Sequence, residues 1–393
     1  MFDFTYCAPT KVYFGKDSDE KIADELRARG CKSALLHYGG ESAQKSGLIT
    51  RIKWAAERAG VTVIELGGVK PNPRLSLVYE GIELCRKHKA DLILAVGGGS
   101  VIDSAKAIAM GYAGGGDVWD YYCGKRAPDK IIPLGVVLTI AAAGSEMSNS
   151  SVITNDTLHI KRGCNAEISR PLFAVLNPEF TLTVPPYQTA CGCADIFMHT
   201  LERYLTGGGN MFLTDSIAEA LMTTVIASSK IVMKKPQDYD ARADLMWAGS
   251  LSHNGLTGCG NDGGDWCTHQ LGHPLSAKYD AAHGASLTAV WGSWARYVYK
   301  NNLNRFHKFA VQVMGVRPNG TRAELALKGI EACEEWFKSM GLPVSIKELG
   351  ATPSGQDLQA LADDYALAVG GVKGSCQKIY RDDALEIYRR ACE

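Results

Sequence analysis

The feature that most constrains this chain's fold is an alternation of short β-rich runs with helix-length amphipathic stretches in its first half. Apolar runs cover residues 33–38, 61–66 and 91–96, and a helical pattern follows each of them. Parallel neighbouring strands need crossover connections, and the connections here are long enough to be helices. The sequence therefore predicts a parallel sheet covered by helices on both faces, an architecture typical of nucleotide-binding α/β domains.

The second half of the chain has a different pattern. After Pro185 the segments are long and rich in Ala, Leu and Met, as in residues 215–235. We expect an α/β N-terminal dinucleotide-binding domain over residues 1–185 and an all-α C-terminal domain over residues 186–393. A length of 393 residues suits two domains.

Charge and cysteine usage narrow the class of partner. The 42 Lys and Arg residues balance 42 Asp and Glu residues, so the net charge gives no attraction to nucleic acid or an anionic membrane. The uncharged run between Lys130 and Glu146 is interrupted by Pro133 and is shorter than the roughly 18 residues of a membrane span. No signal-peptide pattern is visible at the N-terminus, and twelve cysteines scattered from Cys7 to Cys392 suit reduced thiols. We expect a cytoplasmic protein with small-molecule partners and neither a nucleic-acid nor a membrane partner.

A glycine-rich turn follows the third apolar run. Gly97, Gly98 and Gly99 come directly after this buried strand, and Ser100 opens an apolar-periodic helix. Residues without a Cβ let backbone N–H groups approach a pyrophosphate at the positive end of a helix. A tight strand-to-helix turn is the simpler alternative, but it does not require three glycines. The motif predicts a phosphate site, although Ile102 stands where the last glycine of G-x-G-x-x-G would be.

A second glycine turn follows the first apolar run. Tyr38 ends that run and is followed by Gly39, Gly40, Glu41 and Ser42. NAD-selective sites commonly place a carboxylate on the ribose 2′-OH, and that carboxylate repels a 2′-phosphate. The room left by Gly39 favours NADP(H). Two alternatives stay open, because Glu41 supplies the acid if it turns inward and the segment also suits an ordinary β-to-α turn.

Histidines and one aspartate form the most specific spacing in the chain. Asp195 and His199 stand four residues apart on a predicted helix and therefore share a face, His269 and His273 repeat that spacing, and His283 follows. A carboxylate with imidazoles can hold one divalent metal, Fe²⁺ or Zn²⁺, with a position left for a substrate oxygen. Hydrogen-bonded core histidines are the simpler alternative for any one of these residues, but their joint arrangement favours a metal.

Cysteines beside the same segments offer a competing ligand set. Cys191, Cys193 and Cys267 lack the C-x₂-C spacing of a structural zinc site, so we interpret them as packing residues or neighbours of the metal ligands. A serine hydrolase is disfavoured as well, because the sequence has no G-x-S-x-G motif.

Together these motifs resemble the iron-containing (group III) alcohol dehydrogenase family over essentially the whole chain. Within that family the chain looks most like NADPH-dependent butanol dehydrogenases and broad-specificity aldehyde reductases, partly through the turn at Gly39, where NAD-selective relatives usually carry Asp. The resemblance is carried by five matching elements: Phe14-Gly15, the loop 97–106, the run 138–146, the set Gly192, Asp195, His199 and Glu202, and His283-Gly284.

The resemblance implies a dehydroquinate synthase-like fold with the active site in the cleft between an α/β domain and an all-α domain. It implies that Asp195, His199, His269 and His283 bind the metal. His273, which matches a family histidine near the nicotinamide, is then a catalytic candidate for proton relay.

The resemblance also implies a set of cofactor-binding residues. On the 2′-phosphate side they are Gly39, Gly40 and Ser42, on the pyrophosphate side Gly98, Gly99 and Ser100 with Asp103 nearby, and further along the chain Thr139, Ser145 and Lys161. In place of the family's usual Thr-x-x-x-Gly-Thr/Ser-Glu run this chain has a longer run over 139–146, which leaves the individual contacts there less defined.

The activity implied is hydride transfer between NADP(H) and a small primary alcohol or aldehyde of the butanol/butanal type, by a homodimer. Three alternatives remain at this stage. One is an NAD-dependent polyol dehydrogenase of the glycerol type, and another is a dehydroquinate synthase-like lyase, which would need more basic groups to hold a phosphorylated acid. The third is a nucleotide-binding protein whose metal is purely structural.

Overall fold

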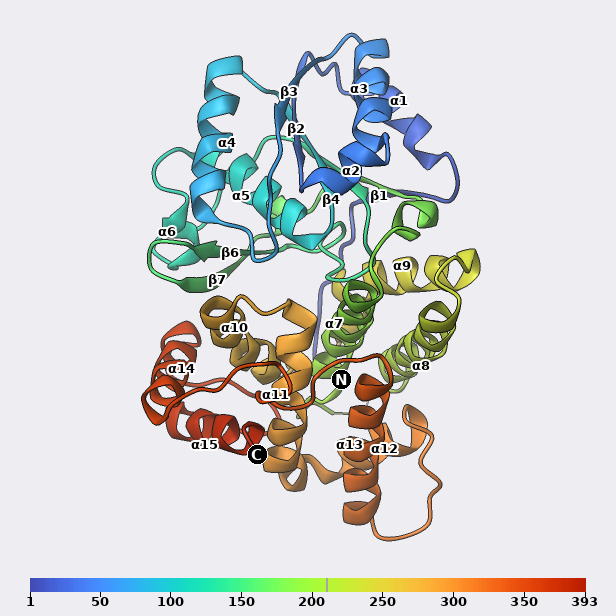
Figure 1. Cartoon of the computed structure of the whole chain (residues 1–393), viewed down its shortest axis with the longest axis vertical. Coiled ribbons are helices and arrows are strands. Elements are labelled where there is room, and N and C mark those ends of the chain that lie inside the picture. The colour runs from blue at the N-terminus through green and yellow to red at the C-terminus, as the bar shows by residue number, and fades with distance from the viewer. Residues whose placement is uncertain (210) are drawn as a thin grey trace. The chain divides into compact units, whose positions relative to one another are not determined.

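The computed structural model describes residues 1–209 and 211–393, with the exception of the side chains of Glu41 and Ser42. It contains a mixed α/β part and a helical part, which form separate compact units (Figure 1).

The α/β unit comprises Ala8–Val184, and the helical unit comprises Pro185–Glu393 together with Met1–Cys7. The first seven residues, which were expected in the α/β domain, thus group with the helical unit. Their backbone joins the helical unit, where the Phe2 N–H donates a 2.9 Å hydrogen bond to the Gly260 carbonyl. No local periodicity signals such a distant pairing.

Six described strands form one parallel sheet in the order β1-β8-β5-β4-β2-β3. The sheet reverses its direction of growth between β2 and β4, and such a switch point opens a ligand crevice at the carboxyl ends of the strands. The strands are β1 (Lys11–Phe14), β2 (Ser33–Tyr38), β3 (Thr62–Leu66), β4 (Leu92–Gly97), β5 (Leu134–Leu138) and β8 (Phe173–Leu176).

Helices cover both faces of this sheet, as their apolar stripes predict. Apolar residues of α1 and α3 pack with Leu36, Leu94 and Val137 on one face, while α4 and α5 contact the sheet on the other (Figure 1). The helices of this unit are α1 (Lys21–Ala28), α2 (Glu41–Lys45), α3 (Leu48–Arg58), α4 (Leu75–His88), α5 (Gly99–Gly114) and α6 (Trp119–Tyr122).

The α/β unit also contains an antiparallel hairpin that the sequence pattern does not predict. It pairs β6 (Ser150–Asn155) with β7 (Ile160–Asn165), and β6 lies against α5. The many polar residues of both strands hide the alternation that marks a half-buried strand.

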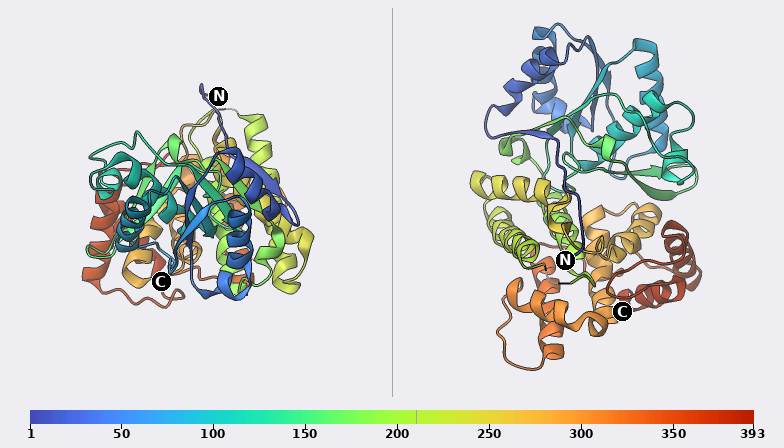
Figure 2. Two further views of the ribbon diagram at one scale, coloured as in Figure 1. Left: turned by 90° about the horizontal axis from the view of Figure 1, so that it is seen from above. Right: turned by 180° about the vertical axis from the view of Figure 1, so that it is seen from behind.

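The helical unit is built around α11, which contacts α7, α10, α13 and α15. Figure 2 shows the helices of this unit, coloured from green to red, from two further directions. Trp291 and Trp294 of α11 are fully buried there. The helices of this unit are α7 (Pro186–Tyr204), α8 (Phe212–Lys234), α9 (Tyr239–His253), α10 (Cys267–Tyr279), α11 (His283–Val298), α12 (Leu303–Gln312), α13 (Arg322–Ser339), α14 (Gly355–Ala368) and α15 (Arg381–Ala391).

Among the described helices, α8 alone is long and apolar enough to cross a membrane by length and composition. It packs against α7 and α9, and 39% of its most apolar window is buried. A core helix passes the same test, so this is weak evidence for a span. The expectation of no membrane partner stays a prediction.

Candidate metal and dinucleotide sites

Helix α7 supplies three acidic or imidazole side chains from one face. It begins at Pro186, where the missing N–H costs no helical hydrogen bond. Asp195, His199 and Glu202 follow at spacings of four and three residues, so they stack along the same side of the helix. All three are at least 95% buried, with exposures of 4%, 5% and 0%.

Helices α10 and α11 bring the remaining histidines. His269 and His273 lie one turn apart on α10, and His283 is the first residue of α11. The backbones of α11 and α7 come close together beside His283, because a Cβ added to Gly284 would lie 2.2 Å from the carbonyl oxygen of Cys191. A glycine at this position therefore lets the two helices approach.

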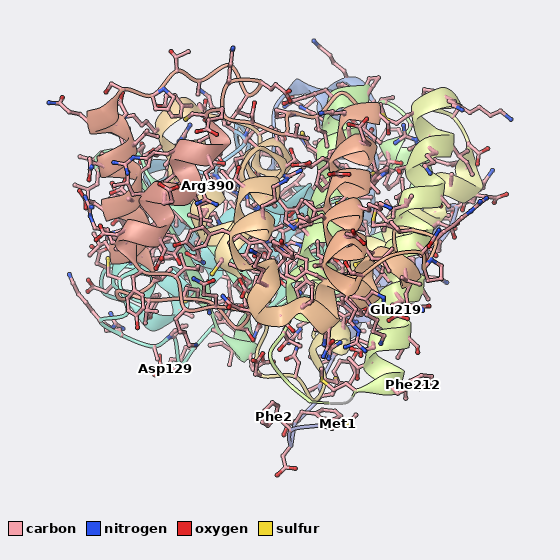
Figure 3. All side chains as sticks on the ribbon, turned by 90° about the horizontal axis from the view of Figure 1, so that it is seen from below. Met1, Phe2, Asp129, Phe212, Glu219 and Arg390 are labelled. Atoms are coloured by element: carbon pink, nitrogen blue, oxygen red, sulfur yellow. The ribbon has the colours of Figure 1, made fainter. Side chains whose placement is uncertain are left out.

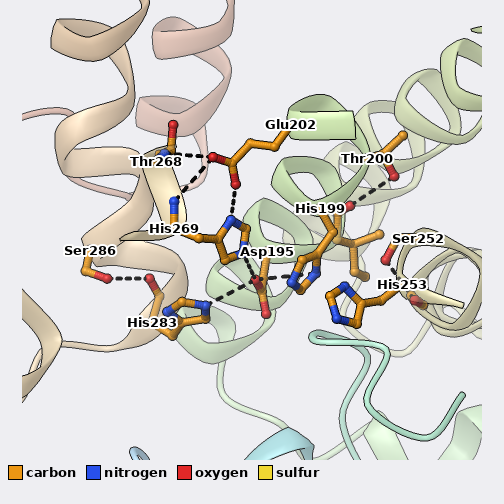
Figure 4. Close-up of polar contacts among 12 residues, drawn as sticks. Asp195, His199, Thr200, Glu202, Ser252, His253, Thr268, His269, His283 and Ser286 are labelled. Atoms are coloured by element: carbon orange, nitrogen blue, oxygen red, sulfur yellow. Dashed lines mark hydrogen bonds and ion pairs between the residues drawn. The ribbon is translucent and has the colours of Figure 1, made fainter. Parts of the chain in front are cut away.

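These helices direct three imidazole nitrogens at one carboxylate oxygen (Figure 4). Asp195 Oδ1 lies 3.7 Å from His199 Nδ1, 3.6 Å from His269 Nε2 and 3.6 Å from His283 Nε2. The four residues that the family resemblance implies as metal ligands thus meet in one place, and three of them, Asp195, His199 and His269, meet the spacing of a metal-binding group.

The spacing fits a metal ion better than a hydrogen-bonded cluster. In a tetrahedral shell with bonds of about 2.0–2.2 Å, neighbouring ligand atoms lie roughly 3.3–3.6 Å apart. Separations of 3.6–3.7 Å are too long for hydrogen bonds. Asp195 Oδ1, His199 Nδ1 and His269 Nε2 are also buried without a hydrogen bond from any residue that the structure describes. Buried polar atoms normally have partners, so these three suit the binding of a cation.

Glu202 contacts His269 from the side away from Asp195. Its carboxylate is hydrogen-bonded to His269 Nδ1, and it also accepts a 2.7 Å bond from the Thr268 N–H. Burial disfavours the imidazolium, but the carboxylates of Glu202 and Asp195 outweigh it and raise the pKa of His269 to about 9. A metal that binds His269 would therefore displace a proton. In the sequence Glu202 stands out only as part of a motif, although its place on the same helix face as Asp195 and His199 is a usable signal.

His199 is surrounded by cationic and aromatic groups. Its ring lies 4.0 Å from the His253 ring and 6.1 Å from the Trp266 ring, measured between centroids. Burial, reinforced by His253 and His269, lowers the pKa of His199 well below its usual range. A neutral imidazole keeps the lone pair that a metal requires. Sequence reasoning missed His253 and Trp266, which carry no spacing signal.

His273 lies beside this group rather than in it. Its side chain is 7% exposed, and its ring centroid is 5.6 Å from that of His283. Cys191, Cys193 and Cys267, which we interpreted as packing residues or neighbours of the metal ligands, are buried free thiols.

In the α/β unit, the glycine turns meet at one edge of the sheet. Gly39 follows β2, Gly98 follows β4, and Thr139 follows β5 with its N–H donating to the Gly97 carbonyl at 3.1 Å. Tyr38 pairs with Val96 across β2 and β4, so these strands end together at the switch point. This is where a dinucleotide binds in doubly wound sheets.

The glycines of the turn after β4 are also required by packing. A Cβ on Gly98 would lie 2.2 Å from Ile140 Cγ2, and one on Gly99 would lie 2.9 Å from the Ala143 Cβ. The helix α5 starts at Gly99 without a side-chain cap. This turn therefore combines close packing with a helix N-terminus whose N–H groups have no side-chain cap. The need for a tight strand-to-helix turn accounts for part of its glycine content.

Asp103 and Ser145 form a buried polar link, while Ser100 lies in the first turn of α5. Ser145 Oγ donates to Asp103 Oδ1 at 2.6 Å, and the Val152 N–H donates to Asp103 Oδ2 at 2.9 Å. Burial raises the pKa of Asp103. Lys106 of the same helix is fully buried and donates to the carbonyl of Ser145 at 2.8 Å. These contacts fix the run after β5 onto α5.

Lys161 lies on β7 and donates a 2.9 Å hydrogen bond to Asn72 Oδ1. Asn72 is 4% exposed and has left-handed backbone (φ 56°), a conformation that asparagine adopts more readily than most residues. Asn72 was not among the expected cofactor residues, although its position between Pro71 and Pro73 is a usable signal.

The turn after β2 provides space rather than contacts. A Cβ on Gly39 would meet only ordinary van der Waals neighbours, Val69 O at 3.6 Å and Val101 Cγ2 at 3.7 Å, and one on Gly40 would meet nothing within 4 Å. The backbone of Ser42 lies in α2, but its side chain is outside the described part of the structure.

Comparisons with known proteins cover both units. A model described as iron-containing alcohol dehydrogenase matches residues 9–178, and a model of the C-terminal region of the Fe-containing alcohol dehydrogenase family matches residues 189–392. The chain is 40% identical over 393 residues to NADH-dependent butanol dehydrogenase A of Clostridium acetobutylicum, with 100% of each chain covered. It is 33% identical over 353 residues to NADPH-dependent aldehyde reductase YqhD of Escherichia coli, covering 89% of this chain and 90% of that protein.

A solved structure of NADH-dependent butanol dehydrogenase A from Thermotoga maritima matches with a TM-score of 0.96 and 38% identity, covering 100% of this chain and 99% of that one. The match confirms the expected fold, an α/β dinucleotide-binding unit and an all-α unit of the dehydroquinate synthase-like type. The family matches span both halves of the chain and make it an enzyme rather than a binding protein with a structural metal. The chain therefore belongs to the iron-containing alcohol dehydrogenase family.

Proposed function

We propose that the protein is a metal-dependent alcohol dehydrogenase or aldehyde reductase that transfers a hydride between NADP(H) and a small primary alcohol or aldehyde of the butanol/butanal type. The observation that carries this proposal is the convergence of three imidazole nitrogens on Asp195 Oδ1 at 3.6–3.7 Å. Asp195, His199, His269 and His283 would hold one Fe²⁺ or Zn²⁺. Neither ion changes the reaction class, because the hydride is carried by the nicotinamide.

A bound divalent ion would supply Lewis-acid polarisation of the substrate oxygen, and the nicotinamide would accept or donate the hydride. The protein then has to orient the reactants and manage one proton. His273 is our candidate for the proton relay, because its imidazole lies one turn from His269 and beside His283. Histidine is suited to this role by its ordinary pKa near neutrality.

The cofactor preference for NADP(H) rests on the turn after β2. Gly39 leaves space where a carboxylate would repel a 2′-phosphate, and the contacts found for its added Cβ are all beyond 3.4 Å. Related proteins carry both names: the Clostridium acetobutylicum enzyme is NADH-dependent and the Escherichia coli enzyme is NADPH-dependent. We expect this chain to depend on NADPH, as the Escherichia coli enzyme does.

The primary test is assay of the purified protein with butanal and either NADPH or NADH, followed at the nicotinamide absorbance band. Oxidation of NADPH supports the proposal. If neither NADPH nor NADH is oxidised, the proposal is refuted. A lyase of the dehydroquinate synthase type would leave butanal and the nicotinamide absorbance unchanged.

The metal assignment is tested with His269→Ala. We expect this variant to lose bound metal and butanal reduction together, with metal content measured by elemental analysis of anaerobically purified protein. His307→Ala, which removes a histidine of α12 in the same unit, is the matched control and should keep both. Stoichiometric metal and normal turnover in His269→Ala would contradict the assignment.

The cofactor assignment is tested with Gly39→Asp. The added Cβ fits without a close contact, so the fold should be kept. The new carboxylate should raise the KM for NADPH by at least tenfold and change the KM for NADH much less. An unchanged ratio of the two KM values would remove the argument from Gly39.

We also propose that the enzyme is a cytoplasmic homodimer. The dimer is supported by exposed apolar side chains on the helical unit, including Phe2 at 52%, Phe212 at 83% and Leu213 at 69% exposure. Figure 3 labels Phe2 and Phe212 on the same edge of this unit. Large exposed apolar groups in clusters are typical of protein interfaces. Light scattering coupled to size-exclusion chromatography should give twice the mass of the chain, and a monomer at micromolar concentration would contradict the proposal.

A further inference from the structure

We propose that Glu202 is a positioning residue that keeps the proton of His269 on Nδ1, so that Nε2 can bind the metal, and thereby sets the affinity of the site for its ion. The inference rests on the metal site proposed above. Glu202 lies seven residues after Asp195 on α7 and is fully buried. Figure 4 shows its carboxylate on one side of the His269 ring and Asp195 on the other.

The carboxylate of Glu202 is fixed by donors from the first turn of α10. One oxygen, Oε1, accepts the Thr268 N–H at 2.7 Å and the His269 N–H at 3.3 Å. The other oxygen, Oε2, faces His269 Nδ1. The first N–H groups of a helix have no intrahelical partner, and an anion there is stabilised by the helix dipole. Glu202 is thereby held in one orientation.

An ionised carboxylate can only accept hydrogen bonds, so the His269 nitrogen that faces it must be the donor. When Nδ1 carries the proton of the neutral ring, the lone pair lies on Nε2. His269 Nε2 is the atom that lies 3.6 Å from Asp195 Oδ1 and has no hydrogen bond from the described residues. Glu202 therefore selects the tautomer that presents a metal-binding nitrogen to the site.

Charge balance points the same way. Two carboxyl side chains, Asp195 and Glu202, contact His269, and imidazoles bind a metal in their neutral form. A divalent ion would pair with these two carboxylates, and buried charges are tolerated when they are paired in this way.

The test is Glu202→Gln, which keeps the size of the side chain but exchanges one acceptor for a donor. The glutamine oxygen takes over the bond from the Thr268 N–H, so its NH₂ group faces His269 Nδ1. Metal binding at Nε2 then leaves two donors facing each other across this contact. We expect the affinity for Co²⁺ or Zn²⁺ to fall 10- to 100-fold, the range found for partners of metal-binding histidines.

The affinity is measured on the full-length apo-protein by competition with a chelator of known affinity, so the result does not depend on catalysis. Asp215→Asn is the matched control, because it also neutralises a buried carboxylate in this unit. Asp215 accepts hydrogen bonds from Arg305 and Lys308 instead of a histidine, so its variant should bind Co²⁺ as the wild type does.

A residue with a purely structural role would give a different result. It would lower the unfolding temperature of the apo-protein and leave the Co²⁺ affinity and d–d absorption spectrum of the folded fraction unchanged, which would overturn the proposal. Glu202→Asp, which keeps the charge but withdraws the carboxylate by one methylene, should bind Co²⁺ with intermediate affinity. If Glu202→Gln does not fold, wild-type affinity in Glu202→Asp overturns the inference instead.

The two proposals fail in different ways. If the wild-type protein binds no Co²⁺, or if His269→Ala binds it as tightly as wild type, the proposed metal site is refuted. If the wild type binds Co²⁺ and reduces butanal while Glu202→Gln keeps the same affinity within twofold, only the role of Glu202 is refuted.

Discussion

Gly284→Ala tests how the closeness of two helix backbones places the metal site. The added Cβ would lie 2.2 Å from Cys191 O and 2.8 Å from the Cα of the same residue. Carbon atoms pack at about 3.5–4.0 Å, so the backbones of α7 and α11 have to separate by roughly 1 Å. Both contact atoms are backbone, and no side-chain rotation can relieve them.

The separation acts directly on the candidate ligands. Gly284 follows His283, and Cys191 lies one turn before Asp195 on α7. The pair His283 Nε2 and Asp195 Oδ1 is 3.6 Å apart, and metal sites hold their distances within about 0.2 Å. A shift of about 1 Å should therefore weaken metal binding at least tenfold and reduce turnover by about 100-fold. Overpacking of this kind also destabilises the fold by about 1–3 kcal/mol.

The assay has two parts: chelator competition for metal affinity, and the urea midpoint of the apo-protein for stability. Gly355→Ala is the control, because a Cβ at this first residue of α14 meets nothing within 4 Å. It should leave both quantities unchanged or raise the midpoint slightly. If Gly284→Ala binds metal within twofold of wild type, the close approach of the helices does not position the ligands and the reasoning is refuted.

Two further predictions concern the α/β unit. His37 is fully buried, which lowers its pKa from 6.5 to about 4, so the unfolded chain takes up a proton first and stability should fall by about 3 kcal/mol as the pH drops from 6.5 to 4. Urea midpoints across that range should be flatter for His37→Gln, and equal slopes would contradict the prediction. Gly98→Ala places a Cβ 2.2 Å from Ile140 Cγ2 at the dinucleotide turn, and should weaken NADPH binding at least tenfold in a fluorescence titration. Gly163→Ala, whose Cβ makes only ordinary contacts, should bind normally, and equal affinity in the two variants would count against a phosphate role for the turn.

Much of the α/β unit was predictable because its strands are marked by local patterns. The run 33–38 became β2 without a change of bounds, and the run 91–96 became β4 shifted by one residue. Continuous apolar strands covered on both faces are easily recognised. The hairpin of β6 and β7 consists mostly of polar residues, so no apolar pattern predicts it. The placement of Met1–Cys7 depends on contacts with residues far along the chain.

The sequence was enough to predict the four candidate metal ligands, but not the residues that hold them in position. Asp195 and His199 share a helix face at a spacing that is visible in the sequence. The role of Glu202 depends on its contact with His269, a residue 67 positions away on another helix. Which nitrogen of an imidazole faces a carboxylate is set by tertiary packing, and no periodicity records it.

The division of the four candidate ligands among α7, α10 and α11 has a consequence for the kinetic stability of the helical unit. Asp195 and His199 are placed together as soon as α7 forms, whereas His269 and His283 arrive from distant parts of the chain. An ion held by these helices would act as a removable cross-link, and opening of α10 and α11 away from α7 would require its release. The lifetime of the native enzyme at elevated temperature should then follow the dissociation rate of the metal, so that chelation shortens it even where the equilibrium fold is kept.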